Sequence, residues 1–331
     1  MHTSNSLFAL TDNTVLRIDD GSVAWSTPVA GAEVLLAADD GTLSVIGQGF
    51  VRVDGGAEEG RTVVTRLHTD GQVLEQIEVQ PSWRLTVSHA TAGPDGDIYI
   101  AGTAHQGFPL ANVVGSADAL AARLSPDGTM LWVRTLPSEG YESADGITTG
   151  PDGSIYLAFG AVGSLPPPGH SGQDAFVVRL SPDGAEEWIT SLATYEHEYP
   201  HSVHVGNDGR VYVATQTILR DYWGEEKEAV TLHQLSDDGQ VLWSDLVMWR
   251  GDIFMGAFVV RDSVLSAAAT GDLMLMSHQL DGSRRYERHS GGPGSERARA
   301  LVVDQDGHFY LGGFTWEDQR IAFVTACRGP F

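Results

Sequence analysis

The sequence LSPDGTMLWVRTL at residues 124–136 returns 56 residues later as LSPDGAEEWITSL at residues 180–192. In both copies an Asp-Gly pair is followed, four residues after the glycine, by a tryptophan. Asp-Gly favours a tight β-hairpin, because glycine adopts the positive φ that such turns need. The same spacing yields a series of aromatic positions, namely Trp25, Trp132, Trp188, Trp243 and, in a weaker copy, Tyr286, whereas Glu75 takes the aromatic place after Asp70-Gly71.

A second family of turns alternates strictly with the first. It precedes a short β-rich run, as in DDGTLSV from residue 39, PDGDIYIAG from 94, PDGSIYLAFG from 151, NDGRVYVAT from 207, QDGHFYLGG from 305 and the degenerate RDSVLSAAA from 261. The runs beside both kinds of turn are rich in β-branched and aromatic residues, which is typical of strands. No segment shows a sustained helical period.

The two turn families together define a unit of four antiparallel strands with a period of about 55 residues. Such a unit repeated along a chain indicates a β-propeller, in which stacked blades bury each other's faces. We therefore expect an all-β protein with one propeller domain over residues 1–331. Seven four-stranded blades are favoured, with the terminal blades short of a strand or sharing one; six is the alternative. The tryptophan series is expected to pack between blades.

Composition excludes several classes of partner. Lys plus Arg is 20 and Asp plus Glu is 44, and a net charge of −24 disfavours nucleic acid. No apolar stretch is long enough for a membrane helix. The single cysteine, Cys327, rules out an intrachain disulfide. We find no phosphate loop or catalytic motif, expect no cofactor, and expect a monomer. The N-terminus lacks a signal peptide, which predicts a cytoplasmic location unless a signal has been removed.

Several segments resemble the bacterial seven-bladed β-propeller repeat family (SBBP repeats). GYESADGITTGPDGSIYLAFG at 140–160 and GSERARALVVDQDGHFYLGG at 294–313 are similar to the first part of that family's motif. GFPL at 107–110, DALAARLSPDG from 118 and DAFVVRLSPDG from 174 are similar to the second part. The resemblance spans about residues 86–313 and implies the fold. It implies no catalytic residues, because the family motif contains none. The chain departs from the motif's asparagine at Asp97, Ser154, Arg210 and His308, and from its lysine at Arg123 and Arg179.

Strand geometry places the long loops and the crossovers between blades on one face of the ring. These segments combine aromatic, histidine and arginine residues with carboxylates, a composition typical of recognition surfaces. The predicted ligand-binding residues are Trp83, Arg84, Tyr141, Glu142, Tyr199, His201, Trp223, Trp249 and Arg250.

The segment YEHEYPHSVH at residues 195–204 is the densest cluster of these groups. The candidate catalytic residues are His201, Glu198, His197 and Tyr141, with a histidine as general base. A metal site would need converging imidazoles and a carboxylate, but the spacing of the histidines fits no zinc motif, and we predict no metal. Glu142, Glu198 and Glu296 occupy the same place in three repeats, which favours a structural task.

Two functional hypotheses remain, and the sequence leaves open whether the chain is an enzyme. The first is a non-enzymatic binding propeller that recognises a protein, a peptide, a glycan or a small-molecule ligand through the long-loop face and the channel mouth. The alternative is a lyase, hydrolase or cyclase with histidine, glutamate and tyrosine residues at the channel mouth. Loops that differ in length and content favour one asymmetric site.

Overall fold

The computed structural model describes most of the 331 residues. The described ranges are 6–11, 13–20, 22–38, 41–52, 58–80, 85–93, 96–105, 108, 113–114, 116–136, 140–162, 172–194, 197–206, 208–220, 226–249, 254–260, 263–270, 272–291, 295–303, 309–316 and 320–327. None of the described residues forms a helix that is long and apolar enough to cross a membrane.

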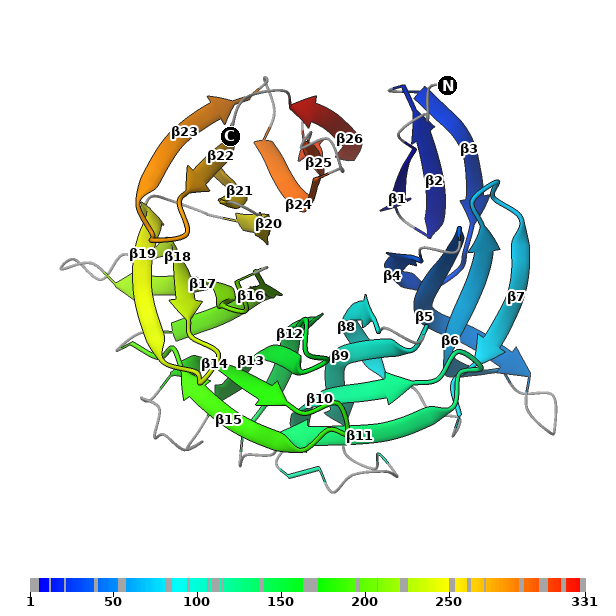
Figure 1. The fold of residues 1–331 in the computed structure, drawn as a ribbon. Helices are drawn as coiled ribbons and strands as arrows, with labels where there is room; N and C mark the ends of the chain where they lie inside the picture. The colour runs from blue at the N-terminus through cyan, green and yellow to red at the C-terminus, as the bar shows by residue number, and fades with distance from the viewer. Residues whose placement is uncertain are drawn as a thin grey trace.

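The described strands form antiparallel sheets arranged in a ring (Figure 1). We number the sheets in chain order. Sheet 1 holds β1 (Leu7–Thr11), β2 (Thr14–Asp19) and β3 (Ser22–Pro28); sheet 2 holds β4 (Ala32–Ala37), β5 (Thr42–Arg52), β6 (Glu58–His68) and β7 (Val73–Glu78); sheet 3 holds β8 (Thr86–Ala92), β9 (Ile98–His105), β10 (Ala117–Leu124) and β11 (Met130–Leu136). Sheet 4 holds β12 (Glu142–Thr149), β13 (Ile155–Val162), β14 (Gln173–Leu180) and β15 (Glu186–Ser191); sheet 5 holds β16 (His197–Val205), β17 (Val211–Arg220), β18 (Glu226–Leu235) and β19 (Val241–Trp249). Sheet 6 holds β20 (Phe254–Val260), β21 (Val264–Thr270), β22 (Asp272–His278) and β23 (Arg284–Ser290), and sheet 7 holds β24 (Ser295–Val303), β25 (Phe309–Trp316) and β26 (Arg320–Cys327).

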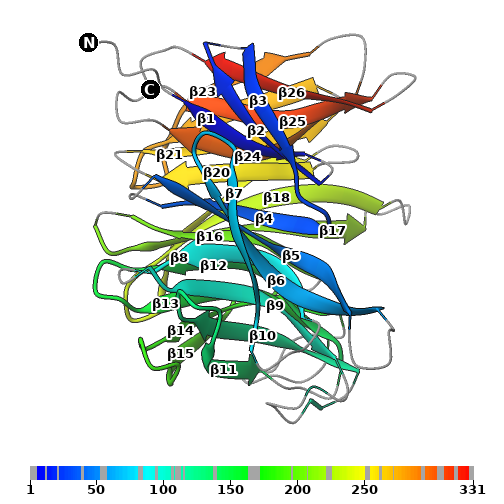
Figure 2. The same ribbon diagram turned by 90° about the vertical axis from the view of Figure 1, so that its right-hand side faces the viewer.

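The fold class is confirmed as an all-β propeller of antiparallel blades, but not every sheet is complete. Sheets 2 to 6 have four strands each, whereas sheets 1 and 7 have three. These two sheets lie at the same side of the ring, beside its opening (Figure 1, Figure 2). The favoured count of seven blades is therefore corrected, although the expected shortening of the terminal sheets is found: β1 has no inner neighbour and β26 no outer neighbour among the described strands. If sheets 1 and 7 are counted together as one blade at the closure of the ring, the ring has six blades, which was the alternative.

The predicted Asp-Gly hairpins are confirmed where the structure describes them; the turn at residues 305–307 lies outside the described residues. Gly184 and Gly239 have φ values of 84° and 83°, in the region that only glycine adopts easily. In the same turns the hydroxyls of Ser181 and Ser236 donate to Asp183 and Asp238. These turns lead from the third to the fourth strand, and therefore place the tryptophan on the outermost strand of each sheet.

The tryptophans join neighbouring sheets, as expected. The indole Nε1 of Trp188 on β15 donates to the carbonyl of Asp237 in the hairpin of sheet 5, at 2.8 Å. A Cβ added to Gly239 would lie 2.8 Å from the same indole, so only glycine lets the ring pack there. Further bonds of this kind join Trp25 to Thr69, Trp132 to Pro182 and Trp243 to Leu280.

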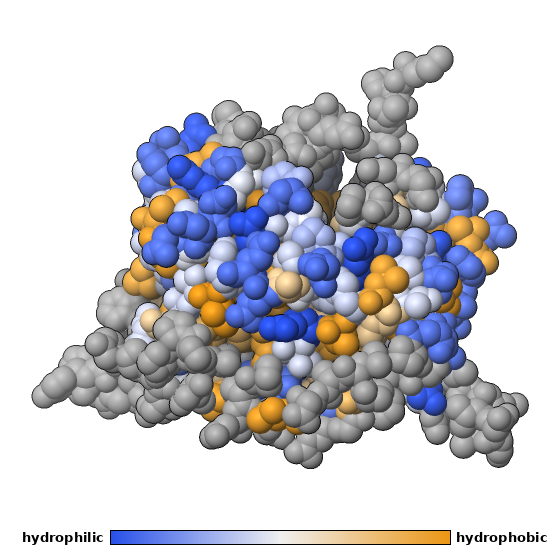
Figure 3. Space-filling model, turned by 60° about the horizontal axis from the view of Figure 1, so that its bottom comes forward, coloured by the Kyte–Doolittle hydropathy of each residue, from blue (hydrophilic) through white to orange (hydrophobic). Residues whose placement is uncertain are grey.

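The outer surface is mixed rather than apolar. Exposed large apolar side chains such as Leu131, which is 51% exposed, occur on the outer strands. On the face that Figure 3 shows, apolar residues are interspersed with hydrophilic ones over the described surface. Single exposed apolar residues are normal for folded proteins, so this surface alone marks no site.

Substitution of Trp188 tests the link between sheets 4 and 5. Trp188→Phe removes the indole bond but keeps an aromatic ring, and we expect it to lower the free energy of unfolding by about 1 kcal/mol. Trp188→Ala also removes the packing against Gly239, and we expect a loss of about 3 kcal/mol. Urea unfolding of the three proteins measures both values. Equal stabilities of Trp188→Ala and the native chain would contradict the interlocking role.

Candidate functional site

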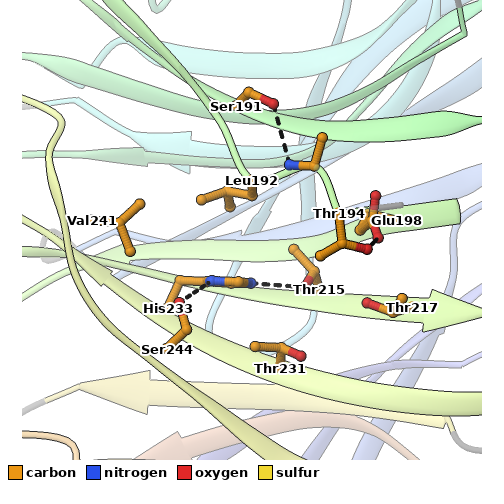
Figure 4. Close-up of a pocket in the computed structure, with 11 residues that line it drawn as sticks. Ser191, Leu192, Thr194, Glu198, Thr215, Thr217, Thr231, His233, Val241 and Ser244 are labelled. Carbon is orange, nitrogen blue, oxygen red and sulfur yellow. Dashed lines mark hydrogen bonds between the residues drawn. The ribbon is translucent and has the colours of Figure 1, made fainter. Parts of the chain in front are cut away.

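A polar pocket of about 300 Å³ lies between sheets 4 and 5 (Figure 4). Its walls come from the crossover that leaves β15, from the start of β16, and from β17, β18 and β19. The lining residues are Ser191, Leu192, Ala193, Thr194, Glu198, Thr215, Thr217, Thr231, His233, Val241 and Ser244. The crossover wall lies at the end of the sheet opposite the Asp-Gly hairpins, whereas Val241 stands directly after the Asp238-Gly239 hairpin, so the lining runs along sheet 5. We call it the sheet 4–5 pocket.

The pocket exists because two threonines stand where the preceding sheet has phenylalanines. Thr215 pairs with Thr231 in sheet 5, at the register where Phe159 pairs with Phe176 in sheet 4. The two phenylalanine rings lie 5.4 Å apart and fill the interface with sheet 3. Threonine side chains are much smaller, so the corresponding interface of sheet 5 keeps an open space.

The surfaces that face these two pairs are alike. Sheet 3 presents Ala101 and Ala119 to the phenylalanines, and sheet 4 presents Ala158 and Ala175 toward sheet 5. The opposite walls therefore do not compensate for the smaller threonines. Relative to sheet 4, the open space therefore follows from the smaller threonines of sheet 5.

His233 also interrupts the apolar repeat, and its neighbour Ser244 does the same. They occupy the places that Val178 and Ile189 have in sheet 4. The imidazole of His233 lies between two hydroxyls, with Nε2 at 2.9 Å from Oγ1 of Thr215 and Nδ1 at 2.8 Å from Oγ of Ser244. Burial lowers the pKa of His233 to about 4, so the ring is neutral at physiological pH.

Glu198 supplies the carboxylate of the pocket. It is 1% exposed, it accepts a hydrogen bond from the hydroxyl of Thr194, and it pairs with Thr217 in the sheet. Glu142 and Glu296 are buried at the same register of β12 and β24. The repeated burial supports the expected structural task, and only Glu198 of the three also borders the pocket.

The four catalytic candidates have different surroundings. His197 accepts a hydrogen bond from the backbone amide of Gln173 at its Nδ1, at 3.1 Å. Nε2 of His201 lies 2.8 Å from Oε1 of Gln216. Tyr141 is 45% exposed. Of the four, Glu198 alone lines the pocket.

The other predicted ligand-binding residues are only partly placed. Tyr199 is half-buried on β16, and Glu142 is buried and therefore does not present its side chain on the loop face. Trp83, Arg84, Trp223 and Arg250 lie outside the described residues, and so does the side chain of Trp249. The prediction that these residues bind a ligand stays a prediction.

Sequence reasoning missed Thr215, Thr231, His233 and Ser244. The signal was a comparison of corresponding strands: DAFVVRL at residues 174–180 in sheet 4 has AVTLHQL at residues 229–235 as its counterpart in sheet 5. The threonine and histidine there replace inward-facing apolar residues. An isolated polar residue in a strand does not show which face it occupies until the register is known.

No protein-family model matches the chain, and no curated protein sequence matches it. Solved structures with the same fold include a PL25 ulvan lyase bound to -[GlcA(1-4)Rha3S]-, with 10% identity, a TM-score of 0.59 and coverage of 91% of this chain and 84% of that chain. The polysaccharide lyase Uly1 is 11% identical over 98% of this chain and 89% of that chain, with a TM-score of 0.54. YCF48 bound to D1 peptide is 11% identical over 93% of this chain and 85% of that chain, with a TM-score of 0.53. At these identities the likeness shows the propeller fold alone.

The low pKa of His233 gives the protein a pH-dependent stability. The pKa is about 4 in the folded chain and 6.5 for a free histidine side chain. Above pH 6.5 the ring is neutral in both states and contributes nothing. Between pH 6.5 and 4 only the unfolded chain takes up the proton, so the free energy of unfolding falls by up to about 3 kcal/mol.

His233→Gln keeps a hydrogen-bonding side chain that does not titrate. We expect the variant to lose less stability than the native chain as the pH falls from 6.5 to 4. Thermal unfolding followed by circular dichroism at both ends of this range measures the difference. Parallel losses in the two proteins would show that His233 does not carry the effect.

Proposed function

We propose that this chain is a binding propeller that holds a protein, peptide or glycan ligand on its long-loop face. The sheet 4–5 pocket would anchor one polar group of that ligand. The observation that carries the proposal is a pocket at the place where sheet 5 has Thr215, Thr231, His233 and Ser244 instead of the four apolar side chains of sheet 4. Such a change lowers packing and costs stability, which a binding role explains.

The pocket suits an uncharged group that both donates and accepts hydrogen bonds. Its hydroxyls and the neutral imidazole of His233 can do both, and the carboxylate of Glu198 accepts. Leu192 and Val241 supply apolar contact. Its volume of about 300 Å³ lies at the small end of ligand pockets, which fits one side chain or one sugar ring rather than a whole macromolecule.

Binding is favoured over catalysis at this place. A general base works best when its pKa lies near the working pH, and the pKa of His233 at about 4 is far below it. Glu198 is the only member of the predicted catalytic set beside the pocket. The propeller fold itself decides nothing, because its solved neighbours include lyases and a peptide-bound protein.

A variant that copies sheet 4 into sheet 5 tests the proposal. Thr215→Phe, Thr231→Phe, His233→Val and Ser244→Ile together fill the pocket and leave no unpaired histidine. A ligand is first identified with the native chain on a glycan or peptide array. We expect the variant to bind that ligand at least about tenfold more weakly than the native chain does, and to have an unchanged or higher melting temperature. Calorimetry measures the affinity and circular dichroism the melting temperature.

Leu74→Phe is the matched control, because it adds a ring on an exposed position of β7, where Leu74 is 49% exposed. It should leave binding unchanged. Full binding by the filled variant would contradict the proposal. So would native protein that binds nothing on the arrays but turns over a substrate.

A further inference from the structure

Two hydroxyl groups of the sheet 4–5 pocket have no partner within the described part of the chain. Thr217 on β17 and Thr231 on β18 line the pocket, and no hydrogen bond joins either side-chain hydroxyl to another described residue (Figure 4). Thr217 is only 5% exposed, so its side chain lies inside the protein. A buried hydroxyl without a protein partner costs free energy, and a ligand in the pocket can recover that cost.

These hydroxyls belong to one polar face of sheet 5. Thr215 pairs directly with Thr231, and Thr217 stands two residues beyond Thr215, so the three side chains lie on the same side of the sheet. His233 follows on the same side of β18, and Ser244 pairs with it on β19. Neighbouring strands are about 5 Å apart, so the polar groups of this face extend over about 10 Å from β17 to β19.

The imidazole of His233 makes this face a donor and an acceptor of hydrogen bonds. A neutral imidazole donates through one nitrogen and accepts through the other. Its partners are the hydroxyls of Thr215 and Ser244, so one hydroxyl accepts from the ring and keeps its own O–H for a ligand. The other hydroxyl donates to the ring and keeps a lone pair. The hydroxyls of Thr217 and Thr231 each add a donor and an acceptor.

The lining of the pocket carries no positive charge. It contains no lysine or arginine, the imidazole of His233 is neutral, and its only acidic residue is Glu198. A carboxylate or sulfate group of a ligand would be buried beside Glu198 without a cation, which is costly. The net charge of −24 also repels anions from the whole protein. The pocket therefore disfavours acidic ligands.

A protonated amine does not match the pocket either. An ammonium group only donates hydrogen bonds, so it cannot use the O–H donors of the polar face. Glu198 accepts a hydrogen bond from Thr194, and Glu142 and Glu296 are buried at the same register of other inner strands. The burial of a glutamate at this register is thus a repeated feature of the fold and does not indicate a cation site.

A peptide side chain would use only part of the polar face. Serine, threonine, asparagine and glutamine each carry one polar group, which cannot reach hydroxyls on three strands at once. A hexose ring carries hydroxyls around its edge, and each of them donates and accepts. The volume of about 300 Å³ has room for several groups of the size of water, at about 30 Å³ each. Leu192 and Val241 offer apolar contact to the C–H groups of such a ring.

We propose that the sheet 4–5 pocket binds a neutral hexose ring and that Thr217 and Thr231 form hydrogen bonds with its hydroxyls. The inference rests on the binding function proposed above, and it narrows the ligand to an uncharged glycan. The three strands of the polar face supply hydrogen bonds on several sides of the ring. The lack of a cation in the lining separates neutral sugars from uronic and sulfated ones.

Calorimetric titration with the methyl glycosides of glucose, galactose and mannose tests the proposal, and the methyl glycosides of the corresponding uronic acids are the charged probes. At about pH 7.5 we expect at least one neutral glycoside to bind with a Kd of about 1 mM or tighter, and its uronate to bind at least about tenfold more weakly. Failure of all three neutral glycosides to bind would overturn the proposal, and so would equal or tighter binding of the uronate.

Thr217→Val and Thr231→Val each remove one hydroxyl and keep the shape of the side chain. We expect each variant to bind the neutral glycoside about fivefold more weakly, because one hydrogen bond to the sugar is lost. The melting temperature should be unchanged or higher, because no bond within the protein is lost. Thr135→Val on β11, the outer strand of sheet 3, is the matched control and should bind as the native chain does. Undiminished binding by both pocket variants refutes the assignment.

Two further probes separate this inference from the binding function on which it rests. The N-acetyl amide of asparagine represents a peptide side chain, and n-butylamine represents an ammonium group. If either probe binds the native chain more tightly than the glycosides and loses affinity in the variant that copies sheet 4 into sheet 5, the pocket binds a ligand but the hexose inference is wrong. If the affinity for the glycoside persists in that variant, the sugar occupies another site, which also refutes the inference.

Discussion

The hydrogen bond from an outer-strand indole to a hairpin carbonyl of the next sheet is the constraint on which the ring depends. It fixes the distance and the tilt between neighbours, and it works only because glycine leaves room for the indole ring, as Gly184 and Gly239 do. Each sheet alone has two apolar faces. Stacking buries them, and the indole bonds fix the stagger at which they meet. The inner strands are thereby brought to the centre of the ring.

Much of the fold could be read from the sequence because its signals are local. Asp-Gly turns and the tryptophan that follows them lie within a few residues of each other, and the structure confirms both the hairpins and the packing of the indoles. The number of complete blades could not be derived in this way. It depends on whether strands pair across the opening of the ring, which is a contact between the two ends of the chain and leaves no local pattern.

The candidate site was harder to predict, because it too depends on contacts between segments that leave no local pattern in the sequence. The prediction followed loop composition and selected residues such as His197 and His201, which the structure directs to separate partners. The pocket instead arises from Thr215, Thr231, His233 and Ser244 on regular strands. Their importance appears only when corresponding positions of two sheets are aligned by register. A repeat protein can thus carry its specific chemistry in the framework, where one unit departs from its neighbours.

The joint between sheets 2 and 3 is built differently from those described above. Glu75 stands in the aromatic place of sheet 2, and Ile77 packs on Gly128 instead of an indole. Two main-chain bonds join the sheets there, from the amide of Gln80 to Gly128 at 3.0 Å and from the amide of Met130 to Gln80 at 2.8 Å. Every residue except proline carries the main-chain groups that form these two bonds. Substitution of side chains therefore leaves this contact between sheets 2 and 3 in place. Substitution of single tryptophans can weaken the other contacts between sheets, whereas the main-chain bonds keep sheets 2 and 3 aligned.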